Sequence, residues 1–277
     1  MRRWKSITMP DEPKPTDASR IIRVGTSGFS YADWLGPFYP PRLAKAHMLD
    51  YYANVFDTVE INATYYAIPG PRSVESMLQK VGETFEFTVK AHQDMTHNRD
   101  RATDVLPRFL EALKPFAEAG KLGCVLLQFP FSFAHTPDNR GFVRFLVEAL
   151  QPHRMVVEFR HRSWVNDEIM AFLRQIGAGY CAVDEPRLPG LPPPSAESTA
   201  PVGYVRFHGR NKEKWWRHEK AEERYDYRYT PDELGEWLPK IQALADRSLR
   251  VYVFFNNHVR GQAPANAREL KARLGLT

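Results

Sequence analysis

Short apolar runs alternate with longer segments in which apolar residues recur at helical spacing along most of the chain. The first pattern is typical of buried strands and the second of amphipathic helices. The runs predict eight strands, at residues 21–25, 59–62, 85–91, 122–129, 155–159, 180–184, 204–208 and 251–255. The segments of helical period predict helices at residues 46–56, 72–81, 104–119, 139–150, 165–176, 230–247 and 266–274.

This alternation of strands and helices predicts the fold class. Two strands joined through a helix normally lie parallel, which is α/β architecture. Eight such strands within about 250 residues indicate a single closed (β/α)₈ barrel of the TIM type rather than an open doubly wound sheet. We expect residues 21–277 to form this one domain, after a polar and flexible N-terminal arm at residues 1–20.

One connection departs from this alternation of strands and helices. Between the sixth and seventh predicted strands, residues 185–203 read EPRLPGLPPPSAESTAPVG, which is too rich in proline for a helix. An extended loop is therefore predicted to replace or shorten the sixth helix. A linker between two domains is the alternative, but the strand and helix pattern resumes in phase afterwards, which favours the loop.

Composition narrows the class of protein. With 43% hydrophobic and 26% charged residues, the chain has the composition of an ordinary globular protein. The net charge of +5 is compatible with anionic partners and selects none of them. Cys124 and Cys181 both lie in apolar runs and are interpreted as buried, reduced thiols. Because no secretory signal or apolar run of about 18 residues is present, we expect a cytoplasmic protein with no membrane partner.

In a barrel of this type, active sites form at the C-terminal ends of the strands. Side chains alternate along each strand, so the apolar residues of segments such as TVEIN and YVRFH should face the helices and send their polar neighbours inward. The inward polar residues predicted at these ends are Glu60, Asn62, Thr88, Lys90, His92, Gln128, Glu158, Arg160, Asp184, Arg206, His208, Asn256 and Asn257.

Charges gathered inside a barrel need an explanation, because a charge buried alone costs several kcal/mol. One explanation is a salt-bridge network that only fills the top of the barrel. For a single pair such as Glu158 and Arg160, this structural explanation and a functional one are equally good. For the whole set, apolar residues would plug the barrel equally well or better. A polar-ligand or catalytic site is therefore the favoured interpretation.

The residue types suggest roles in acid/base chemistry. The predicted catalytic residues are Glu60, Lys90, Glu158, Asp184 and His208. The predicted substrate-binding residues are Asn62, His92, Gln128, Arg160, Arg206, Asn256 and Asn257. Guanidinium groups suit a carboxylate or phosphate, and an ordinary histidine titrates near neutrality. This set suits proton abstraction, isomerisation or hydrolysis, and a Schiff base on Lys90 is a less favoured alternative.

A divalent-metal site is a further alternative. Glu60, Glu158, Asp184 and His208 together offer ligands for Mn²⁺, Mg²⁺ or Zn²⁺. Arg160 and Arg206 would lie beside such an ion, and their repulsion disfavours it. The prediction therefore assigns no metal ligands and leaves the cofactor unknown.

Two aromatic loops add shape to the predicted site. Residues 25–40, GTSGFSYADWLGPFYP, contain Trp34, Phe38 and Tyr39, which are expected to wall a pocket. Residues 214–229, KWWRHEKAEERYDYRY, interleave aromatic and charged residues. This second loop is interpreted as a lid on the barrel, and stacking on sugars or bases is the alternative.

The chain also resembles a known family along nearly its whole length. The segments that carry the resemblance are GTSGFSYADWLGPFYP, YYANVFDTVEINATYYAIP, FEFTVKAHQDMTH, LLQFPFSF, VVEFRHRSW, YVRFHGRN, YDYRYTPDEL and VFFNNHVRGQAPANA. Together they are similar to the YecE-like family, the domain of unknown function numbered 72. The resemblance implies a TIM barrel in a single cytosolic domain. It implies no reaction, so no catalytic role is transferred from it.

Three classes of function follow from the sequence. The first is an enzyme that acts by acid/base chemistry on a polar small molecule, anionic or sugar-like, at the C-terminal mouth of the barrel. The second is a nucleic-acid-binding or endonuclease-like barrel, suggested by the basic charge and the aromatic loop. The third is a protein that binds a small molecule without turning it over. Bound divalent metals or a long basic groove would favour the second class.

Overall fold

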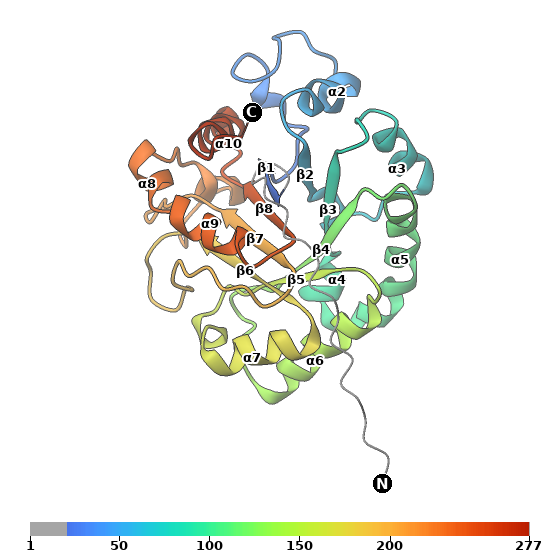
Figure 1. Ribbon diagram of the computed structural model, residues 1–277, viewed down its shortest axis with the longest axis vertical. Helices are drawn as coiled ribbons and strands as arrows, with labels where there is room; N and C mark the ends of the chain where they lie inside the picture. Colours follow the sequence, from blue (N-terminus) through green and yellow to red (C-terminus); the bar gives the residue numbers. More distant parts are fainter. Residues whose placement is uncertain (1–20, 277) are drawn as a thin grey trace.

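Eight parallel strands form one sheet that curls into a barrel, with helices around its outside (Figure 1). The computed structural model describes residues 21–276, so the predicted arm at residues 1–20 lies outside the described residues. The sheet order is β1, β8, β7, β6, β5, β4, β3, β2. The strands are β1 (Ile22–Thr26), β2 (Thr58–Ile61), β3 (Glu86–Lys90), β4 (Leu122–Gln128), β5 (Met155–Glu158), β6 (Gly179–Asp184), β7 (Val202–Phe207) and β8 (Arg250–Phe255). The predicted (β/α)₈ barrel is confirmed.

The helices follow the predicted order. They are α2 (Met48–Ala53), α3 (Pro71–Leu78), α4 (Gln93–Thr96), α5 (Ala102–Glu118), α6 (Pro137–Ala149), α7 (Asp167–Ile176), α8 (Pro231–Gly235), α9 (Leu238–Ala245) and α10 (Gln262–Arg273). Short 3-10 helices lie in the connections: η1 (Ala32–Trp34), η2 (Lys45–His47), η3 (Ala63–Tyr65), η4 (Arg99–Arg101), η5 (Arg162–Trp164), η6 (Ala221–Tyr225) and η7 (Val259–Gly261). Residues 185–201 contain no helix, which confirms the predicted proline-rich loop.

One predicted helix is divided in two. The pattern predicts a continuous helix over residues 230–247, whereas the structure has α8 and α9 with Glu236 and Trp237 between them. Thr230 caps α8 and accepts a hydrogen bond from the Glu233 backbone N–H at 3.3 Å. Pro239 lies in the first turn of α9, where the missing N–H costs nothing, whereas inside a continuous helix it would remove a hydrogen bond.

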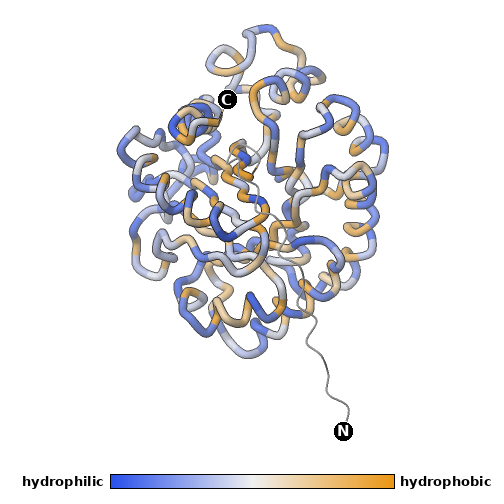
Figure 2. The backbone as a smooth tube through the Cα atoms, in the orientation of Figure 1, coloured by the Kyte–Doolittle hydropathy of each residue, from blue (hydrophilic) through white to orange (hydrophobic). Residues whose placement is uncertain are grey.

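Apolar side chains fill two regions, one on each face of the curled sheet. The larger lies between the strands and the surrounding helices, and Figure 2 shows hydrophobic segments concentrated on the central strands. The smaller fills the barrel interior. It comprises Cys124, Leu126, Val156, Cys181, Val183, Val202, Tyr204, Tyr252 and Phe254. This inner cluster excludes water below the strand ends and supports the polar groups there.

A charged network that the sequence analysis missed lies at the N-terminal ends of the strands. Glu86 on β3 accepts hydrogen bonds from Arg250 at 2.8 Å and from the Tyr252 hydroxyl at 2.7 Å. Arg23 on β1 pairs with Asp57 next to β2. Charged groups therefore lie at both ends of the barrel interior, with the apolar cluster between them.

The barrel closes at a seam between β1 and β2, the two ends of the sheet order. Within residues 21–276, an isolated bridge between Ser27 and Glu60 joins these strands. The Tyr52 hydroxyl adds to the closure, because it accepts from the Thr26 backbone N–H at 2.9 Å and donates to the Thr58 carbonyl at 3.1 Å. Gly25 permits this approach, since a Cβ there would overlap the Thr58 carbonyl oxygen.

We predict that Gly25→Ala destabilises the protein by about 2 kcal/mol or more, because the added methyl group forces the seam apart. Chemical denaturation measures the change. The control is Gly141→Ala inside α6, where a Cβ meets nothing within 4 Å. That variant should gain up to about 1 kcal/mol from helix propensity. Equal stability of the two variants would show that the seam tolerates separation.

Candidate functional site

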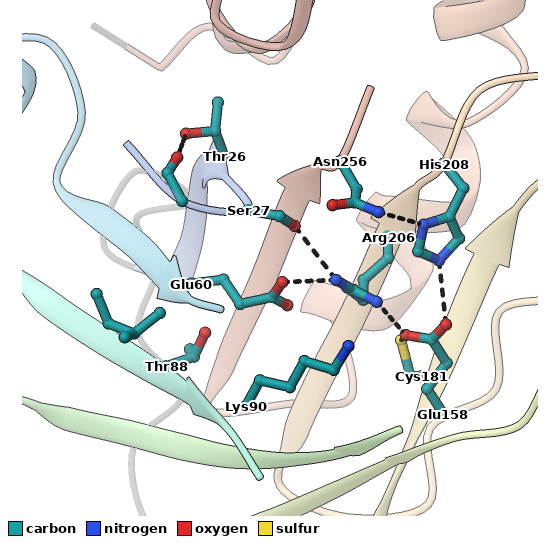
Figure 3. Close-up of polar contacts among 12 residues, drawn as sticks. Thr26, Ser27, Glu60, Thr88, Lys90, Glu158, Cys181, Arg206, His208 and Asn256 are labelled. Carbon is teal, nitrogen blue, oxygen red and sulfur yellow. Dashed lines mark hydrogen bonds and ion pairs between the residues drawn. The ribbon is translucent and has the colours of Figure 1, made fainter. Parts of the chain in front are cut away.

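Five predicted site residues converge inside the barrel at the C-terminal ends of the strands (Figure 3). Glu60 lies on β2 and Lys90 at the end of β3. Glu158 ends β5, Arg206 lies on β7, and His208 follows β7 directly. Alternation along the strands places these side chains inward, as the sequence analysis expected.

Arg206 is the centre of this network. Its guanidinium donates to Glu60 Oε1 at 2.6 Å and to Glu158 Oε2 at 2.6 Å, and its side chain is 1% exposed. A weaker contact reaches the Ser27 hydroxyl at 3.4 Å. Burial alone would lower the pKa of Arg206, but Glu158 and Glu60 outweigh it and raise that pKa well above the ordinary value. Arg206 is therefore a fixed cation between two carboxylates.

The second oxygen of Glu60 has its own partner, which the sequence analysis missed. The Tyr204 hydroxyl donates to Glu60 Oε2 at 2.7 Å and lies 2.9 Å from the Thr88 hydroxyl. Because these residues are buried and bonded to one another, the deep side of the network is complete. Tyr204 lies two positions before Arg206, so the same alternation that predicted Arg206 inward also indicated Tyr204.

Glu158 connects the deep side to the mouth of the barrel. Its Oε1 accepts from Arg160 Nε and, at 3.1 Å, from His208 Nε2. Burial would raise the pKa of Glu158, but Arg160, Arg206 and His208 together hold it well below the ordinary value. Glu158 is therefore an ionised carboxylate across the physiological range, held in place by three donors.

His208 is neutral in this network. Its Nδ1 lies 3.1 Å from Asn256 Nδ2, and its Nε2 lies 3.1 Å from Glu158 Oε1 and 3.0 Å from Arg160 Nη2. Burial, and then the positive charge of Arg160, lower the pKa of His208 to about 3. The expectation that His208 titrates near neutrality is thus wrong, because that expectation took no account of the loss of water.

Glu185 is a second residue that the sequence analysis missed. Its Oε2 accepts from Arg160 at 3.3 Å, and its Oε1 is buried without a hydrogen-bond partner among the described residues. Burial raises the pKa of Glu185 to about 8, although Arg160 acts in the opposite direction. Glu185 therefore keeps its proton at neutral pH. Its position, two residues after the inward Val183, was the available signal.

Lys90 differs from the two arginines of the site, because no hydrogen bond or ion pair holds its amine within residues 21–276. The amine lies 4.3 Å from the centre of the Tyr65 ring and points toward Arg206 and Glu158 in Figure 3. Burial, and then repulsion from Arg206, lower the pKa of Lys90 to about 7. Nearby His97 is also kept neutral, with a pKa lowered to about 4 by burial and by Lys90.

Asp184 does not belong to this site, contrary to the prediction. Its carboxylate accepts from Tyr229 Oη at 2.8 Å, from Trp237 Nε1 at 2.7 Å and from Arg210 at 2.7 and 2.8 Å, on the helix side of the sheet. The error lies in which alternate residues of β6 face the barrel interior. Cys181 and Val183 point into the barrel, so Asp184 points out.

Asn257 is also misplaced in the prediction. Its amide donates to the Tyr227 carbonyl at 2.8 Å and to Asn266 Oδ1 at 3.0 Å, so it ties the loop after η6 to α10. Tyr252 and Phe254 face the barrel interior. The alternation therefore turns Asn256 inward, onto His208, and Asn257 outward.

The other predicted binding residues lie around the mouth. Gln128 follows the inward Leu126 on β4 and bonds the Phe129 carbonyl at 2.8 Å. His92 caps α4, where its Nδ1 accepts from the Asp94 backbone N–H at 3.2 Å. Asn62 follows β2, and its Oδ1 is buried with no partner in the described part of the chain.

The first of the two aromatic loops departs from the expected position, whereas the second approaches the site. Trp34, Phe38 and Tyr39 are buried in the outer core instead of lining a pocket. Tyr31 from the same loop is close enough to Glu60 that, after burial, this carboxylate raises its pKa. From the loop of residues 214–229, the Tyr225 ring lies 6.1 Å from the His208 ring, as the lid interpretation requires.

The predicted metal alternative loses one of its ligands, because Asp184 lies outside the barrel interior. Within residues 21–276, no group of three or more His, Cys, Asp and Glu side chains is placed to hold one metal ion. Across the same residues, every helix is too short or too polar to span a bilayer.

The fold and this network define a (β/α)₈ barrel with a buried charged site at the C-terminal ends of its strands. The family model described as "Protein of unknown function DUF72" matches residues 23–277, and the chain belongs to this family. The YunF protein of Bacillus subtilis, described as UPF0759, is 32% identical over 272 residues, which is 92% of this chain and 95% of that protein. The resemblance stated from the sequence is thus confirmed.

Two solved structures extend the comparison. A DUF72 family protein from Thermotoga maritima is 41% identical, with a TM-score of 0.86 over 92% of this chain and 99% of that one. A DUF72 family protein from Enterococcus faecalis is 27% identical, with a TM-score of 0.83 over 93% and 96%. These descriptions give the family and the fold, and they name no reaction.

We predict that Arg206→Met destabilises the protein by about 3–5 kcal/mol, because it leaves Glu60 and Glu158 buried without their shared cation. Guanidinium unfolding measures the loss. The matched control is Arg260→Met, which removes a 69% exposed arginine paired with Asp226 and should cost less than about 1 kcal/mol. If Arg206→Met lowers the free energy of unfolding as little as Arg260→Met does, the inner carboxylates take up protons at little cost.

We also predict that Glu185→Gln alters the pH dependence of stability. The folded state keeps the Glu185 proton to about pH 8, whereas the unfolded chain releases it near pH 4.5, so this group lowers stability as pH rises through that window. Glutamine has no such proton to lose. Melting temperatures should match wild type near pH 4.5, with the variant increasingly more stable toward pH 8. A difference that is constant with pH would contradict the assignment.

Proposed function

We propose that the protein is an enzyme that performs acid/base chemistry on a polar, anionic small molecule at the C-terminal mouth of the barrel. The observation that carries the proposal is a charge imbalance on the inner face. Arg160, Arg206 and the partly charged Lys90 face Glu60 and Glu158, because Glu185 is protonated at neutral pH and does not offset the charge of Arg160. A carboxylate or phosphate on the ligand would balance this charge.

The arrangement argues against a network that serves stability alone. A plug needs every buried polar group to be satisfied, as Glu60 and Tyr204 are on the deep side. In contrast, Glu185 Oε1 and Arg206 Nε are buried without hydrogen-bond partners within residues 21–276. Unsatisfied groups of this kind reduce stability, and a bound ligand would complete them.

The structure suggests a division of roles different from the one expected from the sequence. Glu158 and His208 are positioning residues in this proposal, because Glu158 is held by three donors and His208 by Asn256. Lys90 and Glu185 are the proton carriers, because each titrates close to neutrality. Arg160 is bonded to both Glu158 and Glu185 and is the proposed anion-binding residue.

We expect small anions to stabilise the wild-type protein. The probes are inorganic phosphate, small carboxylic acids and sugar phosphates. The measurement is the shift that each probe causes in the melting temperature of the protein. A ligand at 100 times its dissociation constant should add about 2.7 kcal/mol. Arg160→Met should lose most of this shift, since it removes the cation that faces the mouth.

The control for this experiment is Arg140→Met, which removes a surface arginine paired with Glu168 between α6 and α7 and should keep the full ligand-induced shift. Stabilisation by oligonucleotides, with none by small anions, would overturn the proposal in favour of a nucleic-acid-binding barrel. Binding of an anion that is never turned over would favour a binding protein instead.

A further inference from the structure

The carboxylates nearest Lys90 are already engaged by other donors. Glu60 uses both oxygens on Arg206 and Tyr204, and Glu158 uses both on Arg206, Arg160 and His208. A lysine kept only for ion pairing would take one of these oxygens. In the described structure, the Lys90 amine instead rests over the Tyr65 ring at the rim of the network.

The backbone around Lys90 is fixed although its amine is not bonded. Lys90 ends β3, and its carbonyl accepts from the Thr64 hydroxyl at 2.6 Å. The same hydroxyl lies 2.9 Å from the Ile61 carbonyl, so η3 and its Tyr65 ring are held against the strand end. The amine is thus presented from a rigid strand at the place where a barrel enzyme meets its substrate.

We propose that Lys90 is a nucleophile that forms an imine with an aldehyde or ketone that carries a carboxylate or phosphate group. This inference rests on the same site as the proposed function and narrows its substrate to carbonyl compounds. The anionic group would bind Arg160, and the carbonyl carbon would meet the Lys90 amine. Because the pKa of Lys90 is lowered to about 7, a substantial fraction of its amine is uncharged at neutral pH, as a nucleophile requires.

The proposed step balances without a further reactant. Lys90 Nζ attacks the carbonyl carbon, a C–N bond forms, and the C–O π electrons move to oxygen. The nitrogen loses a proton and the oxygen gains one, which gives a carbinolamine. A second proton lets the hydroxyl group leave as water while the C=N bond forms. Glu185, whose carboxyl is protonated on the same face, is the acid that supplies this proton.

Reductive trapping of the full-length protein tests the inference directly. Glyoxylate, pyruvate and glyceraldehyde 3-phosphate are the probes, each incubated at pH 7 with sodium cyanoborohydride. Trapping adds the mass of the carbonyl compound less one oxygen atom, and peptide mapping locates the adduct. Lys90 should be modified at least about tenfold faster than other lysines with one or more of these probes. Its rate should level off just above pH 7, whereas rates at exposed lysines continue to rise.

Lys240 is the matched control. It is also a half-buried lysine over an aromatic ring, 4.5 Å from the centre of the Trp237 ring, but it lies outside the barrel and donates to the Pro194 carbonyl. Lys240→Met should leave the adduct unchanged, and Lys90→Arg should abolish it while keeping the charge. Because mapping on wild type identifies the modified lysine, the test holds even if a variant folds poorly.

Modification of Lys90 at the rate of Lys240 with all three probes would overturn the inference. If phosphate or carboxylates still stabilise the protein in that case, Lys90 is an anion-binding charge and the proposed function stands. If Lys90 is trapped but small anions without a carbonyl have no effect, the proposed anion site fails while the nucleophile remains. The two outcomes are therefore distinguishable.

Discussion

The mouth of this barrel depends on one buried cation shared by two carboxylates. Arg206 bonds Glu60 on β2 and Glu158 on β5 and so spans the barrel interior from β7. Each carboxylate is then completed by its own neighbours, Tyr204 on one side and His208 on the other. Without the shared guanidinium, Glu60 would have no cation bonded to it within residues 21–276, and Glu158 would keep only Arg160. Breaking a buried ion pair in this way is strongly destabilising.

This arrangement separates a fixed interior from a reactive rim. The interior groups have pKa values moved far from neutrality, so Glu158 stays ionised and His208 stays neutral whatever the pH of a cell. At the rim, Lys90 and Glu185 are moved by burial into the neutral range. Removal from water is the main cause of the shifts of His208, Lys90 and Glu185, whereas the neighbouring cations keep Glu158 ionised against the effect of burial.

The sequence predicted the barrel well because strand and helix periods are local properties. Strand parity was harder: Asp184 was placed inward and Glu185 overlooked, although Cys181 and Val183 define the inner face of β6. The pKa shifts could not be predicted from the sequence, since the low pKa of His208 comes from burial and from Arg160, 48 positions away. The role of Gly25 at the seam could not be predicted either, because a close contact made by one residue leaves no periodic pattern in the sequence.

The seam between β1 and β2 has a consequence for how the chain is made. Glu60, which bridges to Ser27 there, precedes its partner Arg206 by 146 residues, and β1 pairs with β8, the last strand. During synthesis, Glu60 therefore exists for most of the chain's growth without its cation. Until β7 has been added, the interior has to stay hydrated around that carboxylate, so the barrel is expected to dry and close only near the end of translation.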